Sequence, residues 1–90
     1  KMNAVISVVG KDCVGILATV SQKCKEANAN ILEVSQTVLN NYFAMIMLVT
    51  IDNLNMDFID FVEMLEKKGH EEGLEIHVMH EDIFNSMHKI

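Results

Sequence analysis

The order of hydrophobic patterns along this chain of 90 residues limits it to a small number of folds. Runs of apolar and β-branched residues, typical of strands, alternate with segments whose apolar residues recur every three or four positions, typical of helices. The expected elements are, in chain order, a strand at Met2–Val9, a helix at Val14–Ala27, strands at Asn30–Leu39 and Tyr42–Ile51, a helix at Met56–Glu72, a strand at Leu74–His80 and a short amphipathic tail at Glu81–His88.

Asn40 and Asn41 separate the second and third strands, and asparagine tolerates the positive φ angles that a tight hairpin turn requires. The order β-α-β-β-α-β with one central hairpin is typical of a ferredoxin-like sandwich. We therefore predict an α+β fold: a four-stranded antiparallel sheet with both helices on one face and the first and third strands in its centre. The chain has no proline and no linker-like segment, so residues 1–90 are expected to form a single domain.

Apolar spacing predicts which side of each helix is buried. In the first helix the buried residues are expected to be Leu17, Val20, Cys24 and Ala27, and in the second Leu54, Phe58, Phe61, Val62 and Leu65. Asn55 is a candidate cap for the second helix, with Asp57 favourably placed in its first turn. Gly69 or Gly73 could end this helix, and Gly73 is favoured because an alternating pattern restarts directly after it.

The third strand is apolar on both sides. Ala44, Ile46 and Leu48 are expected to point one way, and Phe43, Met45, Met47, Val49 and Ile51 the other way. One side packs on the helices, so the opposite side needs a cover. We expect two covers, a second copy of the chain and the tail that carries Ile83, Phe84, Met87 and Ile90. The alternative is that this strand is apolar only because it is central.

The charge pattern excludes some classes of partner. The formal net charge is −6 and all seven basic residues are lysines, so the chain lacks the basic patch of a nucleic-acid-binding protein and any arginine clamp for phosphate. The sequence shows no signal peptide and no apolar stretch of membrane-spanning length. Its two cysteines, Cys13 and Cys24, fit a reducing interior better than a disulfide framework. A cytoplasmic location without nucleic-acid or membrane partners is expected.

The segment from Gly10 to Leu17 joins the first strand to the first helix and is the most informative one for function. A glycine-bearing turn of this kind leaves backbone N–H groups at the positive end of the helix, where a small anion can bind. This feature indicates binding and not catalysis.

The same segment resembles the first turn of an ACT domain, a small regulatory module that senses amino acids. The family turn reads Asp-Arg-Pro-Gly followed by two aliphatic residues. Asp12, Gly15, Ile16 and Leu17 fit it, whereas Cys13 and Val14 stand in place of the arginine and the proline. Asn30 and Ile31 at the start of the second strand fit as well. The resemblance covers the whole chain in element order. The length of the chain is similar to that of stand-alone, single-ACT proteins of prokaryotes.

This resemblance implies an amino-acid site between two subunits, built from the first turn of one and the adjoining strand edge of the other. The positions carried over as ligand-binding are Asp12, Val14, Gly15, Ile16, Leu17, Asn30 and Ile31. The backbone amides would receive the ligand carboxylate, Asp12 its ammonium group, and the Asn30 amide offers both a donor and an acceptor. Valine in place of proline at the helix start removes a restraint on φ, so the turn is expected to be less preorganised.

Three of these positions also have a purely structural interpretation. Gly15 could serve the close approach of a ligand or only the tight packing of the helix on the sheet. Asp12 could be a helix N-cap, and Asn30 could merely turn the chain from helix to strand.

No pattern of an enzyme stands out. The sequence shows no Ser-His-Asp order, no paired-carboxylate spacing and no phosphate-binding glycine motif. His77 and His80 are three apart on an expected strand and so face opposite sides, which argues against a metal site that they would share with His88. Cys13 and Cys24 have neither redox nor metal-ligand spacing, and Cys24 is expected in the core. We expect no catalytic residue, no metal and no cofactor.

The leading hypothesis is a non-catalytic, amino-acid-binding regulatory module that acts as a homodimer and signals to a partner protein. The alternative is a ligand-free structural module that dimerises or docks on an enzyme or regulator. A small ferredoxin-like enzyme similar to acylphosphatase ranks last, because that chemistry relies on an arginine to hold phosphate and this chain has none.

Overall fold

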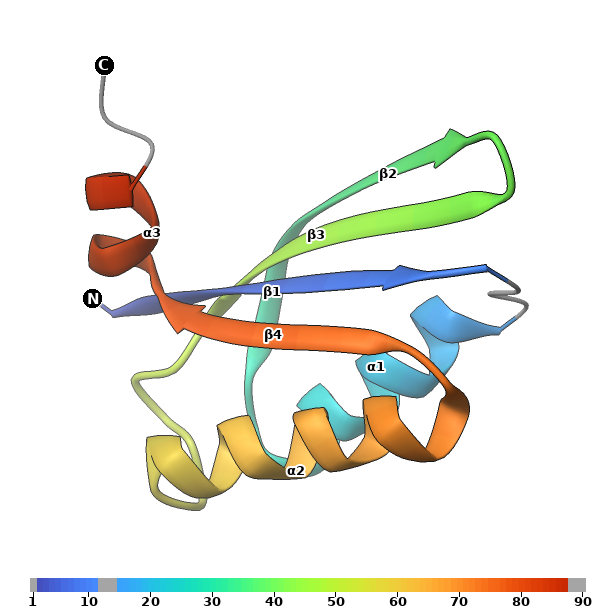
Figure 1. Ribbon diagram of the computed structural model, residues 1–90. Coiled ribbons are helices and arrows are strands. Elements are labelled where there is room, and N and C mark those ends of the chain that lie inside the picture. Colours follow the sequence, from blue (N-terminus) through green and yellow to red (C-terminus); the bar gives the residue numbers. More distant parts are fainter. Residues whose placement is uncertain (1, 12–14, 88–90) are drawn as a thin grey trace.

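The computed structural model describes residues 2–11 and 15–87, with the backbone alone for residue 39. Its elements are β1 (Asn3–Gly10), α1 (Ile16–Glu26), β2 (Asn30–Leu39), β3 (Tyr42–Thr50), α2 (Phe58–Glu72), β4 (Glu75–His80) and α3 (Glu81–Met87), as Figure 1 shows. The predicted element order is confirmed. α1 begins at Ile16, later than expected, because Gly15 before it has a left-handed backbone (φ 76°) that an α-helix cannot include.

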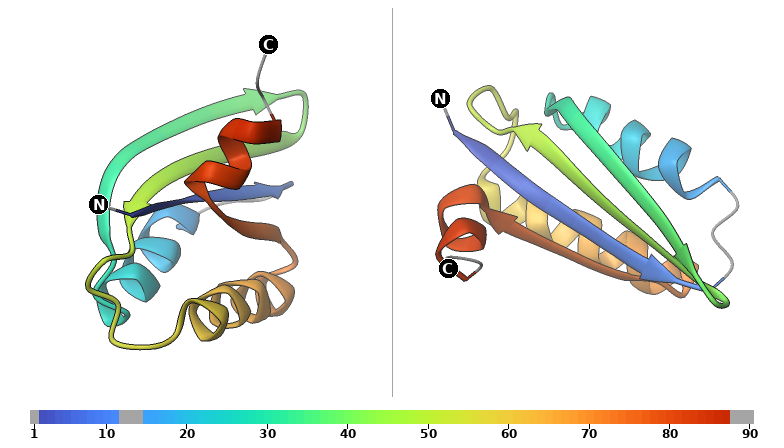
Figure 2. Two further views of the ribbon diagram at one scale, coloured as in Figure 1. Left: turned by 90° about the vertical axis from the view of Figure 1, so that its left-hand side faces the viewer. Right: turned by 90° about the horizontal axis from the view of Figure 1, so that it is seen from above.

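The four strands form one antiparallel sheet in the order β2-β3-β1-β4, so β1 and β3 are central as predicted. α1 and α2 cover one face of this sheet, and α3 lies on the opposite face (Figure 2). Asn40 has a φ of 57° in the turn between β2 and β3, which confirms the predicted hairpin.

The core lies between the sheet and the pair α1 and α2. Alternate side chains of the central strands are buried there, Ile6 and Val8 from β1 and Met45 and Met47 from β3. Between the two methionines Ile46 points the other way and is 45% exposed. The predicted alternation of the third strand is therefore confirmed.

The buried side of α1 differs from the prediction at one position. Ile16, Val20 and Cys24 are buried, whereas Leu17 is partly exposed. Residues four apart lie almost in line along a helix, and a helix that begins at Ile16 extends the line of Val20 and Cys24 to that residue. Leu17 is about 100° further round the helix and faces outward.

The side of α2 that faces the core agrees with the predicted stripe. Phe61 and Leu65 are fully buried, Val62 is half-buried, and Leu54 and Phe58 are partly buried against the same core.

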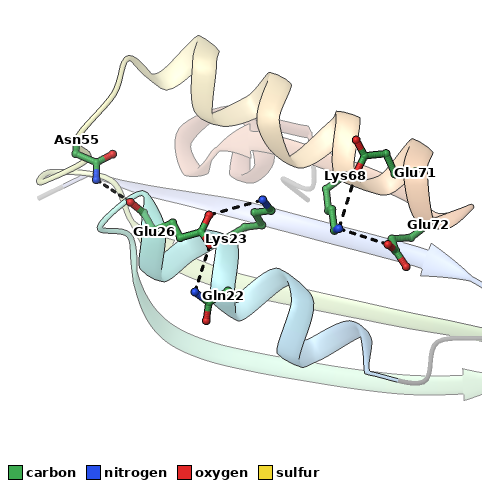
Figure 3. A network of polar contacts seen from close by, with 7 residues as sticks. All are labelled: Gln22, Lys23, Glu26, Asn55, Lys68, Glu71 and Glu72. Atoms are coloured by element: carbon green, nitrogen blue, oxygen red, sulfur yellow. Dashed lines mark hydrogen bonds and ion pairs between the residues drawn. The ribbon is translucent and has the colours of Figure 1, made fainter.

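Asn55 is not the cap of α2, contrary to the prediction. The N-cap position is Asp57, which forms no side-chain cap hydrogen bond. Asn55 instead ties the loop before α2 to the end of α1, because its Nδ2 donates to the carbonyl oxygen of Glu26 (2.7 Å) and its backbone N–H donates to that of Ala27 (3.1 Å). Figure 3 shows this contact beside the side chains of Gln22 and Lys23, which also reach Glu26.

The predicted end of α2 at Gly73 is confirmed. Gly73 has a φ of 71°, and the backbone N–H of Leu74 donates to the Gly69 carbonyl oxygen (2.8 Å), as in a helix ended by a left-handed glycine. Gly69 itself lies against β4: a Cβ added there would be 2.8 Å from Cγ1 of Ile76 and 3.0 Å from the carbonyl oxygen of Leu74. This glycine is therefore required for packing rather than for its backbone angles.

The predicted tail forms α3, which covers part of the second face of the sheet. Phe84 is half-buried against that face, whereas Ile83 and Met87 are exposed. Ile90, the fourth apolar residue of the expected tail, lies outside the described residues. The tail thus helps to cover the second face of the sheet, as expected. Of its three described apolar side chains, only that of Phe84 packs on this face.

Cys24 is completely buried in the core, as predicted. Desolvation raises the pKa of its thiol from 9.0 to about 11, so the group stays protonated at neutral pH. A buried, protonated thiol of this kind does not act as a nucleophile.

Replacing Gly69 by alanine is expected to destabilise the protein although alanine favours helices. The added methyl group must push Ile76 and the Leu74 carbonyl away, and overpacking of this kind costs about 1–3 kcal/mol. Urea denaturation should therefore show a lower free energy of unfolding for Gly69→Ala. Lys67→Ala on the exposed side of α2 is the matched control and should stay within about 0.5 kcal/mol of the wild type. A Gly69→Ala variant as stable as the wild type would contradict this packing.

The raised pKa of Cys24 predicts a loss of stability at alkaline pH. The folded-state pKa lies above that of the unfolded chain, so the stabilisation is complete below pH 9 and is lost as the pH rises to about 11. Over this range the free energy of unfolding of the wild type should fall more steeply than that of Cys24→Ala, measured by urea denaturation. Equal slopes would show that the thiol ionises as easily in the folded state as in the unfolded chain.

Candidate functional site

The turn that leads into α1 is shaped by Gly15. Its φ of 76° lies in the left-handed region, which residues with a Cβ adopt only with strain. A Cβ added to Gly15 would have no atom of residues 2–11 or 15–87 within 4 Å, so Gly15 does not serve tight packing against the described sheet. Asp12 and Val14, predicted in the same turn, lie outside the described residues, so Asp12 is not tested as an N-cap either.

The start of α1 presents backbone donors. The N–H of Thr19 donates to the carbonyl oxygen of Gly15 (3.0 Å), so the amides of Ile16 and Leu17 precede the first such bond. The leading amides of an α-helix have no acceptor within the helix and lie at its positive end. The first turn of α1 carries no acidic side chain that would neutralise this end. An anion could therefore bind here.

Asn30 and Ile31 belong to a second feature, a hollow of about 340 Å³ between the end of α1 and the start of β2. Its other lining residues are Ser21, Lys25, Asn28 and Ala29. Asn30 does not turn the chain from helix to strand, because Asn28 has the left-handed conformation that does so (φ 64°). Asn30 is instead the first residue of β2 and is exposed, and its backbone N–H donates to Oγ1 of Thr50 (3.3 Å).

Sequence reasoning missed Ser21, Lys25 and Asn28 as neighbours of Asn30. The spacing of Ser21 and Lys25 carried a usable signal, since residues four apart share one side of a helix. Lys25 gives the hollow a cation and Asn28 adds an amide.

The two features lie at opposite ends of one molecule. Gly10, where β1 leaves the sheet toward Gly15, pairs with Phe43, whereas Asn30 pairs with Thr50 seven residues further along β3. At about 3.3 Å per residue the two ends are roughly 23 Å apart along the strand. A single chain therefore does not bring Gly15, Ile16 and Leu17 together with Asn30 and Ile31.

β2 is the edge strand next to this hollow, and most of its side chains are exposed to solvent. All of its residues from Leu32 to Val38 are exposed, including the apolar Val34 and Val38. The strand is ten residues long, pairs with β3 on one side and has no strand on its other side within the described part of the chain. Such an edge is a template for pairing with another strand.

Among the described residues, the histidines and Cys24 do not gather into a metal site. His77 pairs with Ser7 on one face of the sheet and His80 with Ala4 on the other, as their spacing predicts. Within residues 2–11 and 15–87 there is no group of three His, Cys, Asp or Glu side chains that could hold a metal ion. Cys13 and His88 lie outside these residues. No helix in the same ranges is long and apolar enough to cross a membrane.

Comparison with known proteins gives close relatives along the whole chain. A protein of the UPF0237 group from Methanocaldococcus jannaschii is 52% identical over 86 residues, which cover 96% of each chain. A protein of the same group from Clostridium perfringens is 52% identical over 89 residues, which cover 99% of this chain and all of the relative. Neither name states an enzymatic activity.

Solved structures agree with this grouping. An ACT domain protein from Streptococcus pneumoniae superimposes with a TM-score of 0.82 at 41% identity, over 92% of this chain and 93% of the other. A formyltetrahydrofolate deformylase from Pseudomonas syringae superimposes with a TM-score of 0.78 at 25% identity, over 88% of this chain but 27% of the enzyme. The sequence profile of the ACT domain matches residues 3–79. With the fold, the turn at Gly15 and these matches in agreement, the chain belongs to the ACT domain family, whose members are regulatory amino-acid-binding modules.

Proposed function

We propose that this chain is a non-catalytic sensor that binds a free amino acid between two copies of itself and passes the signal to a partner protein. The observation that carries the proposal is the open, left-handed Gly15 at the start of α1, set at the opposite end of the sheet from the hollow at Asn30. The family membership supports an amino acid as the ligand.

A second copy of the chain can bring the turn at Gly15 and the hollow at Asn30 together. If the β2 edges of two copies pair antiparallel about a two-fold axis, each end of one β2 lies beside the opposite end of the other. The two copies of α1, which flank β2 on the same face, are reversed in the same way. The Gly15 turn of one copy then approaches Asn30 and Ile31 of the second copy, and one ligand can contact both.

The chemistry of the two halves fits a zwitterion. The amides of Ile16 and Leu17 and the ammonium group of Lys25 attract a carboxylate. The carboxylate of Asp12 and the side-chain oxygen of Asn30 would receive the ammonium group of the ligand. Val14 would contribute its backbone and Ile31 an apolar contact for the side chain of the amino acid.

Binding at such a junction explains how a domain without catalytic residues could regulate. A ligand that contacts both copies favours the paired geometry by its differential affinity, and this preference is what a partner protein could detect. The output then depends on a surface of the dimer rather than on a reaction.

Gly15→Ala is expected to abolish amino-acid binding, because a Cβ at a φ of 76° strains the turn by about 1–3 kcal/mol and shifts the leading amides. Isothermal titration calorimetry against the twenty amino acids measures this loss. Gly73→Ala is a matched control: its φ of 71° imposes a similar strain at the end of α2, on a residue outside the proposed ligand-binding set. The control should bind like the wild type. Unchanged affinity in Gly15→Ala would refute the site.

Val34→Lys is expected to weaken association and amino-acid binding together. A lysine on an edge strand opposes pairing with another strand, and Val34 lies in the exposed centre of β2. Calorimetry at several protein concentrations, combined with analytical ultracentrifugation, measures both effects. If Val34→Lys binds the amino acid as tightly as the wild type, the site is complete in one copy. If the wild type pairs through β2 but binds none of the twenty amino acids, the ligand-free docking module is the correct alternative.

A further inference from the structure

The hollow at Asn30 is lined mainly by groups that can donate a hydrogen bond. Its described lining residues are Ser21, Lys25, Asn28, Ala29, Asn30 and Ile31. They bring a hydroxyl, an ammonium group and two side-chain amides, together with two apolar side chains, and none of them is acidic. This combination favours a ligand group that accepts hydrogen bonds and carries a negative charge.

Lys25 supplies the positive charge of this hollow. Within the part of the chain that the structure describes it forms no ion pair, whereas Nζ of Lys23 lies 3.6 Å from Oε1 of Glu26. Figure 3 shows the pair of Lys23 and Glu26 on α1. Glu33, the acidic residue of β2, pairs with Leu48 and therefore lies on the face of the sheet opposite α1. The charge of Lys25 is thus available to a ligand.

The other polar groups of the hollow are held beside Lys25. Ser21 precedes it by one turn of α1, so its hydroxyl lies on the same side of the helix. Asn28 is fixed after the helix by its left-handed backbone and by its Nδ2, which donates to the carbonyl oxygen of Asn53 (2.8 Å). All of these groups belong to one copy of the chain. The polarity of the hollow therefore does not depend on how two copies associate.

We propose that the amino acid is dicarboxylic, aspartate or glutamate, and that Lys25 binds its side-chain carboxylate. This inference rests on the proposed function, in which one ligand contacts the turn at Gly15 of one copy and the hollow at Asn30 of the other. The leading amides of α1 receive the α-carboxylate. Lys25 and the hydroxyl of Ser21 receive the second carboxylate. Each of the two positive groups then binds one carboxylate of the same ligand.

Other side chains satisfy the hollow less well. A lysine or arginine ligand would place a second cation next to Lys25, and the two charges would repel each other. An aliphatic ligand could contact Ala29 and Ile31, but it would displace water from Lys25 and Ser21 without replacing the lost hydrogen bonds. Glutamine and asparagine can accept these hydrogen bonds, but they lack the negative charge that Lys25 attracts.

The first test compares ligands and variants by isothermal titration calorimetry. The wild type should bind glutamate or aspartate about fivefold more tightly than glutamine or asparagine at low salt. Lys25→Gln should lower the affinity for the acidic amino acid to that for its amide and leave the affinity for the amide nearly unchanged. Lys25→Arg retains the charge and should retain the preference.

Lys23→Gln is the matched control. It removes the same charge from the same helix, but Lys23 faces Glu26 and does not line the hollow. This variant should prefer the acidic amino acid as the wild type does. A loss of preference in Lys23→Gln equal to that in Lys25→Gln would show that only the net charge of the chain matters, and would overturn the assignment of Lys25.

The second test varies the concentration of sodium chloride. Lys25 is exposed, so salt should screen its attraction for the side-chain carboxylate and reduce the preference for glutamate over glutamine. A preference that does not change with salt would show that the shape of the site, and not the charge of Lys25, selects the ligand. That result would contradict the proposal.

The outcomes separate this inference from the proposed function. If the wild type binds most tightly an amino acid without a second carboxylate, the inference is wrong and the amino-acid site remains. The same conclusion follows if Lys25→Gln keeps the full preference for the acidic amino acid. If the wild type binds none of the twenty amino acids, the proposed function is refuted and this inference with it.

Discussion

The structure depends on the burial of one face of its sheet by two helices. β1 and β3 pair so that Ile6 lies opposite Met47 and Val8 opposite Met45, with all four side chains under α1 and α2. Burying side chains of this size stabilises a fold by about 1.5–3 kcal/mol each, which offsets the entropy lost on ordering. Because side chains alternate along a strand, the same pairing directs Ile46 to the other face. The apolar side chains on the second face of the sheet follow from this division.

The two-layer arrangement also decides how a ligand can be bound. The turn at Gly15 and the hollow at Asn30 lie at opposite ends of the sheet. β1 leaves the sheet toward Gly15 at one end, and β2 enters the sheet at Asn30 at the other end. In the proposed dimer the antiparallel contact of two β2 edges reverses one copy and joins the two halves. Ligand binding and association would then be thermodynamically coupled, which is the property that a regulatory module requires.

Predictions from local sequence pattern were wrong at positions where a tertiary contact or an equivalent neighbouring residue competed with the pattern. Asn55 has a good capping side chain, but the end of α1 offers it carbonyl acceptors of Glu26 and Ala27 that periodicity cannot reveal. Leu17 fits the helical spacing as well as Ile16 does, and the exact starting residue of the helix decided between them. The structural alternative for Asn30 places the turn before β2 at that residue, whereas Asn28, two positions earlier, has the left-handed backbone. Either asparagine could have served, because both tolerate that conformation.

The sequence by itself determined the order of the elements, the central position of β1 and β3, the apolar character of both faces of β3, and the glycines at the ends of the helices. These properties follow from residue spacing and backbone preference, which act over a few neighbouring positions. Only the tertiary structure decided that Gly15 faces open space, that Lys25 and Asn28 join Asn30 in one hollow, and that α3 covers one end of the second face of the sheet. Those facts depend on distances between segments that are remote in the chain, and such distances are set by packing rather than by local pattern.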